Sequence, residues 1–95
     1  MMDARSVVIR PIVSEKSFEM IEQNRYTFQV DKRSSKPQIA LAIAEIFDVT
    51  VLAVNTMNVP GKPRRLRSSK GHTSAWKKAI VTLKAGDSIE FFEGH

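Results

Sequence analysis

The sequence predicts an α+β fold, in which a small antiparallel β-sheet of three to four strands is covered by helices on one face and carries a long basic hairpin loop. Two segments have the spacing and end signals of helices, and three have the alternation of half-buried strands. The expected order is helix, strand, helix, strand, strand, over residues 15–22, 25–30, 36–47, 49–59 and 75–84. A chain of 95 residues has room for one modest core, so we predict a single domain over residues 1–95, with the extended loop at residues 60–74.

The first helix is predicted to begin after Ser14, which is a preferred N-cap residue. Glu15 falls in the first turn, where the helix dipole stabilises a carboxylate, and Asn24 supplies a stop after residues 15–22. Upstream of this helix, the Arg10-Pro11 pair is expected to be only an extended lead-in.

Alternation of apolar and polar residues predicts the three strands. In residues 25–30 the apolar face consists of Tyr26, Phe28 and Val30. In residues 75–84 one face consists of Ala79, Val81 and Leu83, and the other of Trp76, Lys78, Ile80 and Thr82. From Val51 to Val59 the two faces are expected to alternate without interruption.

The second helix has the clearest start signal. Ser35 and Gln38 have the spacing of a capping box, and Pro37 stands in the first turn, where its missing N–H costs nothing. Asp48 is expected to end the helix. The apolar residues that recur at helical spacing, and so should face the sheet, are Ile39, Ile43, Ile46 and Phe47.

Positive charge is concentrated in one short stretch. Eight of the fifteen Lys and Arg residues, and no carboxylate, lie between Val49 and Ala85, so the rest of the chain carries seven cations and ten anions. Such clusters bind the phosphates of nucleic acids, because each neutralised phosphate releases condensed counterions. We therefore predict an RNA-binding site made of Lys62, Arg64, Arg65, Arg67, Lys70, His72, Trp76, Lys77 and Lys78.

Each of these residues also has a simpler interpretation. The cations of the loop are also consistent, on charge alone, with a solvated surface. Trp76 could stack on a base, but a single tryptophan in a strand more often packs in a core or at its edge. His72 could donate to a phosphate or simply face solvent.

Several other classes of function find no support. The chain has no cysteine and only two distant histidines, so we expect no disulfide, no metal site and no cofactor. No nucleophile motif or glycine-rich phosphate loop is present, which predicts a protein that is not an enzyme. No apolar run approaches the ~20 residues that span a bilayer, and the first ten residues lack the order of a signal peptide, so we expect a soluble, unexported protein without membrane insertion.

Six segments resemble the family of the large-subunit ribosomal protein numbered twenty-three, of the bacterial or plastid type. They follow the family order over nearly the whole chain, and the strings Val-Asn-Thr and Trp-Lys-Lys-Ala within them are far more specific than any count of charges. The segments are Arg10–Lys16, Tyr26–Asp31, Lys36–Ile39, Val54–Val59, Pro60–Lys62 and Ala75–Leu83.

This resemblance implies a structural constituent of the large ribosomal subunit, located in the cytoplasm on the ribosome, or in the plastid stroma if the protein is organellar. It implies that the loop binds large-subunit ribosomal RNA beside the exit of the polypeptide tunnel, among neighbouring large-subunit proteins. It also implies that trigger factor and the signal recognition particle dock on Val13, Ser14, Glu15 and Lys16.

Two other functions are compatible with a basic loop. One is a free-standing RNA-binding regulator or RNA chaperone. The other is a peripheral adaptor whose loop binds anionic lipid, but that function calls for an amphipathic helix with apolar residues opposite the cations. Residues 60–74 contain two prolines, two glycines and one leucine instead.

Overall fold

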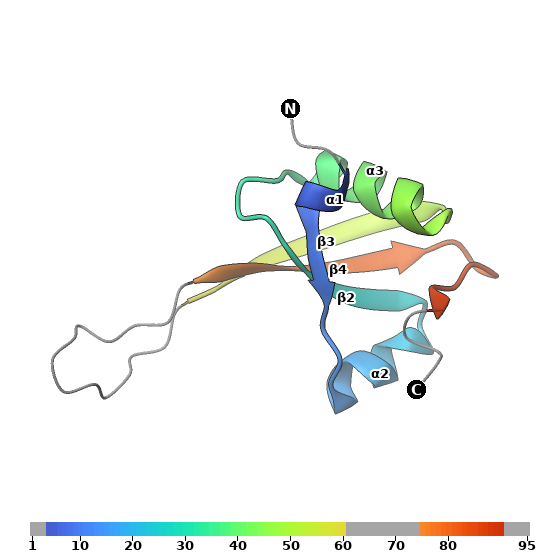
Figure 1. Ribbon diagram of the computed structural model, residues 1–95. Coiled ribbons are helices and arrows are strands. Elements are labelled where there is room, and N and C mark those ends of the chain that lie inside the picture. Colours follow the sequence, from blue (N-terminus) through green and yellow to red (C-terminus); the bar gives the residue numbers. More distant parts are fainter. Residues whose placement is uncertain (1–3, 61–74, 91–95) are drawn as a thin grey trace, which may run out of the picture.

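The computed structural model describes residues 4–60 and 75–90 (Figure 1). In that part of the chain the elements are α1 (Ala4–Val7), β1 (Val8–Pro11), α2 (Glu15–Ile21), β2 (Arg25–Val30), α3 (Lys36–Phe47), β3 (Val51–Val59) and β4 (Trp76–Leu83). The predicted α+β class and the antiparallel sheet are confirmed, while most of the predicted loop, residues 61–74, lies outside the described residues.

The four strands form one antiparallel sheet in the order β1-β2-β4-β3. The Arg10-Pro11 lead-in is the end of β1, an edge strand that pairs with β2. β3 and β4 form the long hairpin, whose pairs run from Val51 with Leu83 to Val59 with Trp76. Val59 and Trp76 form the last pair of this ladder. The chain therefore leaves the sheet after Val59 and re-enters it at Trp76, side by side.

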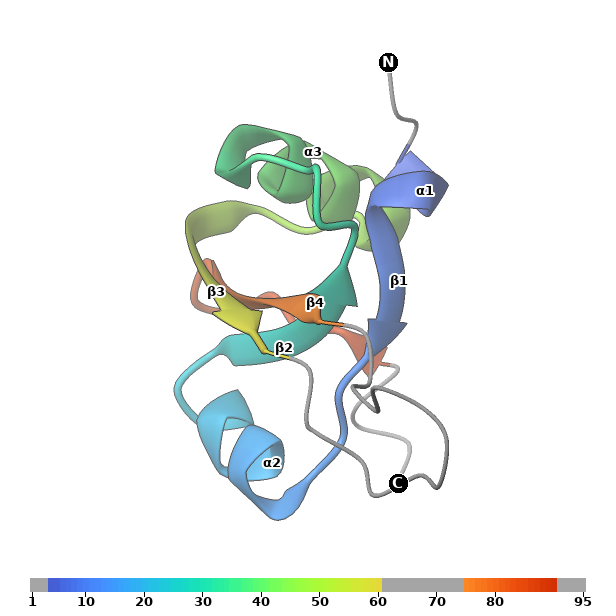
Figure 2. The ribbon, with the colours of Figure 1, turned by 90° about the vertical axis from the view of Figure 1, so that its left-hand side faces the viewer.

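The helices lie on both sides of the sheet. α3 covers one face, as predicted, together with the short α1, which was not predicted. The other predicted helix, α2, lies on the opposite side of the sheet, beside β2 (Figures 1 and 2). The described residues thus form a helical layer of α1 and α3 over the core face, while α2 lies on the second face.

The core lies between the sheet and the α1–α3 layer. The predicted inward residues of β2 and β4 are all buried, and the Phe28 ring contacts the Phe47 ring of α3 at a centroid distance of 5.6 Å. Burying large apolar side chains is the main stabilising term of such a small domain. The buried apolar residues are Val7, Tyr26, Phe28, Val30, Ile39, Ala42, Ile43, Ala79, Val81, Leu83 and Ile89.

The end signals of the two predicted helices, α2 and α3, are confirmed. The Ser35 hydroxyl accepts the N–H of Gln38, and the Gln38 side chain accepts the N–H of Ser35, so that both groups are satisfied. Asp48 ends α3 in the left-handed conformation, with φ 55°. At α2 the Ser14 hydroxyl accepts the N–H of Ser17, and Asn24 follows the helix with φ 59°.

Two expectations were wrong in detail. A register shift between Val51 and Ala53 places Val51 on the same face as Val54, because both pair with core-facing residues of β4, so alternation in β3 is interrupted. Such a bulge inserts one extra residue, here Leu52, which is 64% exposed. On α3, Ile46 is 40% exposed rather than packed against the sheet.

Candidate nucleic-acid interface

The predicted RNA-binding residues fall into two groups. Lys62, Arg64, Arg65, Arg67, Lys70 and His72 lie outside the described residues. Trp76, Lys77 and Lys78 form the first three residues of β4, directly after the basic stretch. The structure therefore describes the place where the basic stretch rejoins the sheet.

Lys77 and Lys78 point to opposite faces, because successive side chains of a strand alternate. Lys77 pairs with the buried Val30, on the helix-covered face, and its ammonium group donates to the Ser34 carbonyl oxygen at 2.6 Å. Lys78 pairs with Gln29 on the other face. The two adjacent lysines thus have different surroundings, which their sequence alone does not distinguish.

Four cross-strand neighbours form a row over this second face, which we call the open-face row: Arg10, Gln29, Lys78 and Met57. The Arg10 Nε donates to the Gln29 side-chain oxygen at 2.7 Å. This bond orients the guanidinium, and its two terminal nitrogens make no hydrogen bond to another residue within the ranges 4–60 and 75–90. Trp76 lies on the same face, two residues before Lys78.

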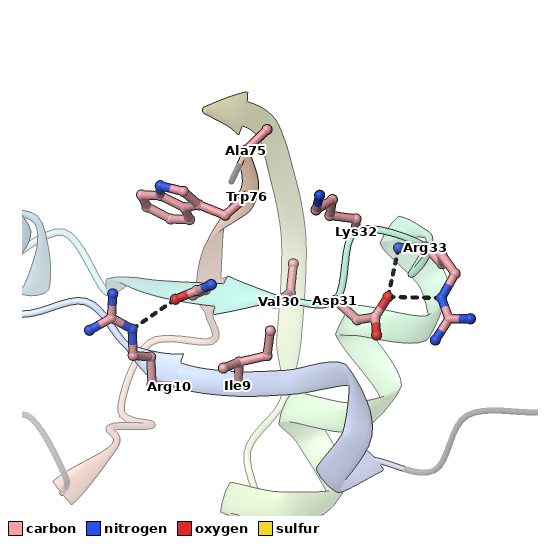
Figure 3. Close-up of a pocket in the computed structure, with 9 residues that line it drawn as sticks. Ile9, Arg10, Val30, Asp31, Lys32, Arg33, Ala75 and Trp76 are labelled. Carbon is pink, nitrogen blue, oxygen red and sulfur yellow. Dashed lines mark hydrogen bonds and ion pairs between the residues drawn. The ribbon is translucent and has the colours of Figure 1, made fainter. Parts of the chain in front are cut away.

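Next to this row is a hollow of about 570 Å³. Trp76 and Arg10 extend toward one side of it, and Lys32 and Arg33 lie on the other (Figure 3). Its remaining wall comes from β1, β2 and the residue before β4. The described residues that line it are Ile9, Arg10, Gln29, Val30, Asp31, Lys32, Arg33, Ala75 and Trp76.

The carboxylate in this lining is compensated by a neighbour. Asp31 Oδ1 accepts the Arg33 backbone N–H at 2.8 Å and lies 3.4 Å from the Arg33 Nε (Figure 3). The backbone bond from Arg33, helped by its side chain, holds the pKa of Asp31 below the ordinary value of 3.8. With Asp31 ionised, the three cations of the lining leave the hollow with a net positive charge.

Sequence reasoning missed Arg10, Gln29, Lys32 and Arg33 as parts of this surface. Gln29 was identifiable as a residue of the polar face of its strand, but nothing in the sequence shows that Arg10 stands beside it. That placement depends on β1 joining the sheet, and β1 was expected to be only a lead-in.

The predicted docking segment lies at the start of α2, away from the Val59–Trp76 end of the hairpin (Figure 1). Val13 is 48% exposed, and Ser14, Glu15 and Lys16 are exposed as well. The Ser14 side chain is engaged in the cap of α2, so its hydroxyl has a structural role of its own. Phe18, one turn later, is 37% exposed and adds an apolar contact to this surface.

Neither a metal centre nor a membrane span emerges from the part of the chain that the structure describes. Over residues 4–60 and 75–90, no three His, Cys, Asp or Glu side chains gather closely enough to hold a metal ion. No helix in the same ranges is long and apolar enough to cross a membrane.

The chain is similar to known bacterial proteins over nearly its whole length. A model of the family described as Ribosomal protein L23 matches residues 6–91. The protein named large ribosomal subunit protein uL23 of Roseiflexus castenholzii is 52% identical over 93 residues, which cover 98% of this chain and 99% of that protein. Its namesake in Desulfitobacterium hafniense is 51% identical over 94 residues, 99% of each chain, and that of Frankia alni is 50% identical over 92 residues, 97% of this chain and 94% of its own. These matches agree with the prediction of a protein that is not an enzyme, and the chain belongs to the Ribosomal protein L23 family.

Proposed function

We propose that this protein is a structural constituent of the large ribosomal subunit, located in the cytoplasm on the ribosome. It binds large-subunit ribosomal RNA through its basic stretch and lies beside the exit of the polypeptide tunnel, among neighbouring large-subunit proteins. The single observation that carries this proposal is family membership over nearly the whole chain.

The described structure supports RNA binding at the loop end of the hairpin. Val59 and Trp76 form the last rung of the β3–β4 ladder, so the cationic stretch between them is attached to a rigid pair of strands. Lys78 and Arg10 extend positive charge from there onto the open face. Clustered cations of this kind supply most of the affinity for a phosphate backbone.

The face of the sheet that carries α2 also offers a surface suited to protein partners (Figure 2). Trigger factor and the signal recognition particle would dock on the exposed segment of Val13, Ser14, Glu15 and Lys16, next to Phe18. A carboxylate at the rim of such a surface contributes mainly to specificity and encounter rate. The exposed Leu41 and Leu52 offer apolar contacts to neighbouring proteins of the subunit.

The decisive experiment is co-sedimentation with large subunits through a moderate salt wash, combined with chemical footprinting of the RNA. We expect the protein to remain bound and to protect one defined patch of large-subunit RNA. Recovery only with free messenger RNA would contradict this function and favour a free-standing RNA-binding regulator or RNA chaperone.

The contribution of the loop is tested with the double variant Arg64→Ala/Arg65→Ala. The affinity for large-subunit RNA should fall, and the log–log dependence on salt should flatten by roughly 0.7–0.9 for each phosphate that is no longer neutralised. The matched control is Lys36→Ala/Lys84→Ala, which removes two exposed cations elsewhere. Equal slopes for the two double variants would show that Arg64 and Arg65 face solvent.

The docking surface is tested with Glu15→Ala against Glu19→Ala, which removes another exposed carboxylate from the same helix. Glu15→Ala should reduce recruitment of trigger factor to ribosomes while leaving assembly into the subunit intact. If both variants recruit trigger factor equally well, Glu15 has no part in docking.

A further inference from the structure

The hollow beside Trp76 has the size and lining of a ligand site. Its volume of about 570 Å³ lies within the range of roughly 300–1,000 Å³ typical of small-ligand sites. Among the described residues, the lining combines one aromatic ring, three cations, a side-chain amide and apolar side chains. This composition differs from that of the docking segment on α2, which presents no tryptophan or arginine.

We propose that this hollow holds one unpaired nucleotide of the bound RNA, with its base against the Trp76 ring and its phosphate at Arg10. The proposal deepens the RNA-binding function proposed above and rests on it. It adds a defined pocket for a single splayed-out base to a surface otherwise explained by charge alone.

Trp76 supplies the aromatic ring of the proposed site. Its side chain is only half-buried, although β4 lies between β2 and β3, and it borders the hollow from one side (Figure 3). Bases that are free of a duplex stack on such rings, and the contact is tolerant of sequence because every base has a π-face. A tryptophan needed only for the core would lie on the helix-covered face, where Ala79, Val81 and Leu83 lie.

Arg10 supplies the phosphate-binding group of the proposed site. Its Nε is bound to Gln29 at 2.7 Å, which holds the planar guanidinium in place beside the hollow. The terminal nitrogens then match the geometry of two phosphate oxygens. Because the Gln29 oxygen accepts from Arg10, its amide nitrogen keeps two donors for a base edge or a sugar hydroxyl.

Charge decides which class of partner fits. Arg10, Lys32 and Arg33 outnumber Asp31, whose carboxylate is already bound to Arg33. A neutral or cationic protein segment would leave these charges uncompensated, whereas a nucleotide phosphate neutralises one of them. A fully paired duplex also fits poorly, because its bases are stacked and paired and so are not free to reach the Trp76 ring.

Trp76 is the only tryptophan of the chain, so its fluorescence reports directly on this site. We expect quenching when the full-length protein is titrated with deproteinised large-subunit RNA or with a short oligoadenylate. We expect little quenching with a perfectly paired RNA duplex at equal occupancy. Equal quenching by the duplex would overturn the proposal that the nucleotide in the hollow is unpaired.

Substitutions at Trp76 separate stacking from packing. Trp76→Leu keeps an apolar side chain without a ring and should lower the affinity for large-subunit RNA about 5- to 150-fold, since base–aromatic stacking is worth roughly 1–3 kcal/mol. Trp76→Phe should retain most of the affinity. Arg10→Gln should flatten the salt dependence by roughly 0.7 in log–log slope.

The outcomes distinguish this proposal from the function on which it rests. Binding to large-subunit RNA with unchanged Trp76 fluorescence would overturn the nucleotide site and leave the proposed function standing. Failure to bind that RNA at all would contradict both. Quenching only after a neighbouring ribosomal protein is added would assign the hollow to a protein segment instead.

Discussion

The two faces of the sheet differ in what covers them. On one face Tyr26, Phe28 and Val81 are almost completely buried under α1 and α3. On the other face the open-face row of Arg10, Gln29, Lys78 and Met57 is half-buried or exposed, and α2 lies beside β2 (Figure 2). One face supplies stability, and the other leaves donors and an aromatic ring available for a partner.

The comparison shows that one strand can supply core residues to one face and outward-facing residues to the other. In β4 the residues Ala79 and Val81 belong to the core, while Trp76 and Lys78 belong to the open face. Period-two alternation therefore separates the core residues of β4 from the residues that we propose to bind RNA. Substitutions at neighbouring positions of one strand test that division.

The largest expected effect is on the core face. Phe28→Ala should lower the free energy of unfolding by about 3–5 kcal/mol, because it leaves a cavity where the ring contacts Phe47. Gln29→Ala, at the next position but on the open face, should change it by less than about 1 kcal/mol. Urea unfolding of both variants measures the difference, and similar losses would contradict the division into two faces.

The adjacent lysines provide the second test. Lys77→Ala should cost about 1–3 kcal/mol of stability, because the Ser34 carbonyl loses an ammonium donor at 2.6 Å. Lys78→Ala should leave stability within about 0.5 kcal/mol and flatten the salt dependence of RNA binding by roughly 0.7–0.9. Thermal unfolding measures the stability of each variant, and salt titrations of RNA affinity measure its phosphate contacts. A stability loss for Lys78→Ala and a flattened salt dependence for Lys77→Ala would contradict these assignments.

A smaller effect is expected where α2 covers the second face. The Thr27 hydroxyl is buried and has no hydrogen-bond partner among the described residues. Thr27→Val should therefore raise the free energy of unfolding by about 1 kcal/mol, because it removes a desolvated polar group while keeping the shape. The control is Thr82→Val, at a half-buried position of the same face, and urea unfolding should show no comparable gain there.

The smallest effect concerns Asp31 at the rim of the hollow. Its pKa is lowered when the protein folds, so its contribution to stability is complete above the ordinary value of 3.8 and is lost as the pH falls through the folded pKa. Asp31→Asn should therefore lose slightly less stability between about pH 5 and about pH 2 than the wild type. Urea unfolding across that range measures it, with Glu19→Gln as the control for removing one exposed carboxylate.

Much of the core could be predicted from sequence. Strict alternation in residues 25–30 identified Tyr26, Phe28 and Val30, and the capping box at Ser35 placed the start of α3 at the right residue. These features depend on contacts within a few residues, so local sequence determines them. The short α1 helix and the β1 strand were missed because four-residue elements carry too little periodic signal and are stabilised mainly by packing.

The candidate site was predictable only in part. A count of charges was enough to indicate the basic stretch, and Trp76 and Lys78 were named within it. The bulge at Leu52 and the position of Arg10 beside Gln29 were not predictable, because strand register is decided by partners that are distant in sequence.

By itself, the sequence determined the fold class, the two capped helices, the inward faces of β2 and β4 and the concentration of positive charge, since each depends on neighbouring residues. Only the tertiary structure decided that Lys77 binds Ser34 while Lys78 faces outward, and that Arg10, Gln29 and Trp76 border one hollow. The physical reason is that strand pairing brings together side chains that are distant in the sequence, such as Arg10 and Gln29, which are 19 residues apart, and nothing local records which of them will meet.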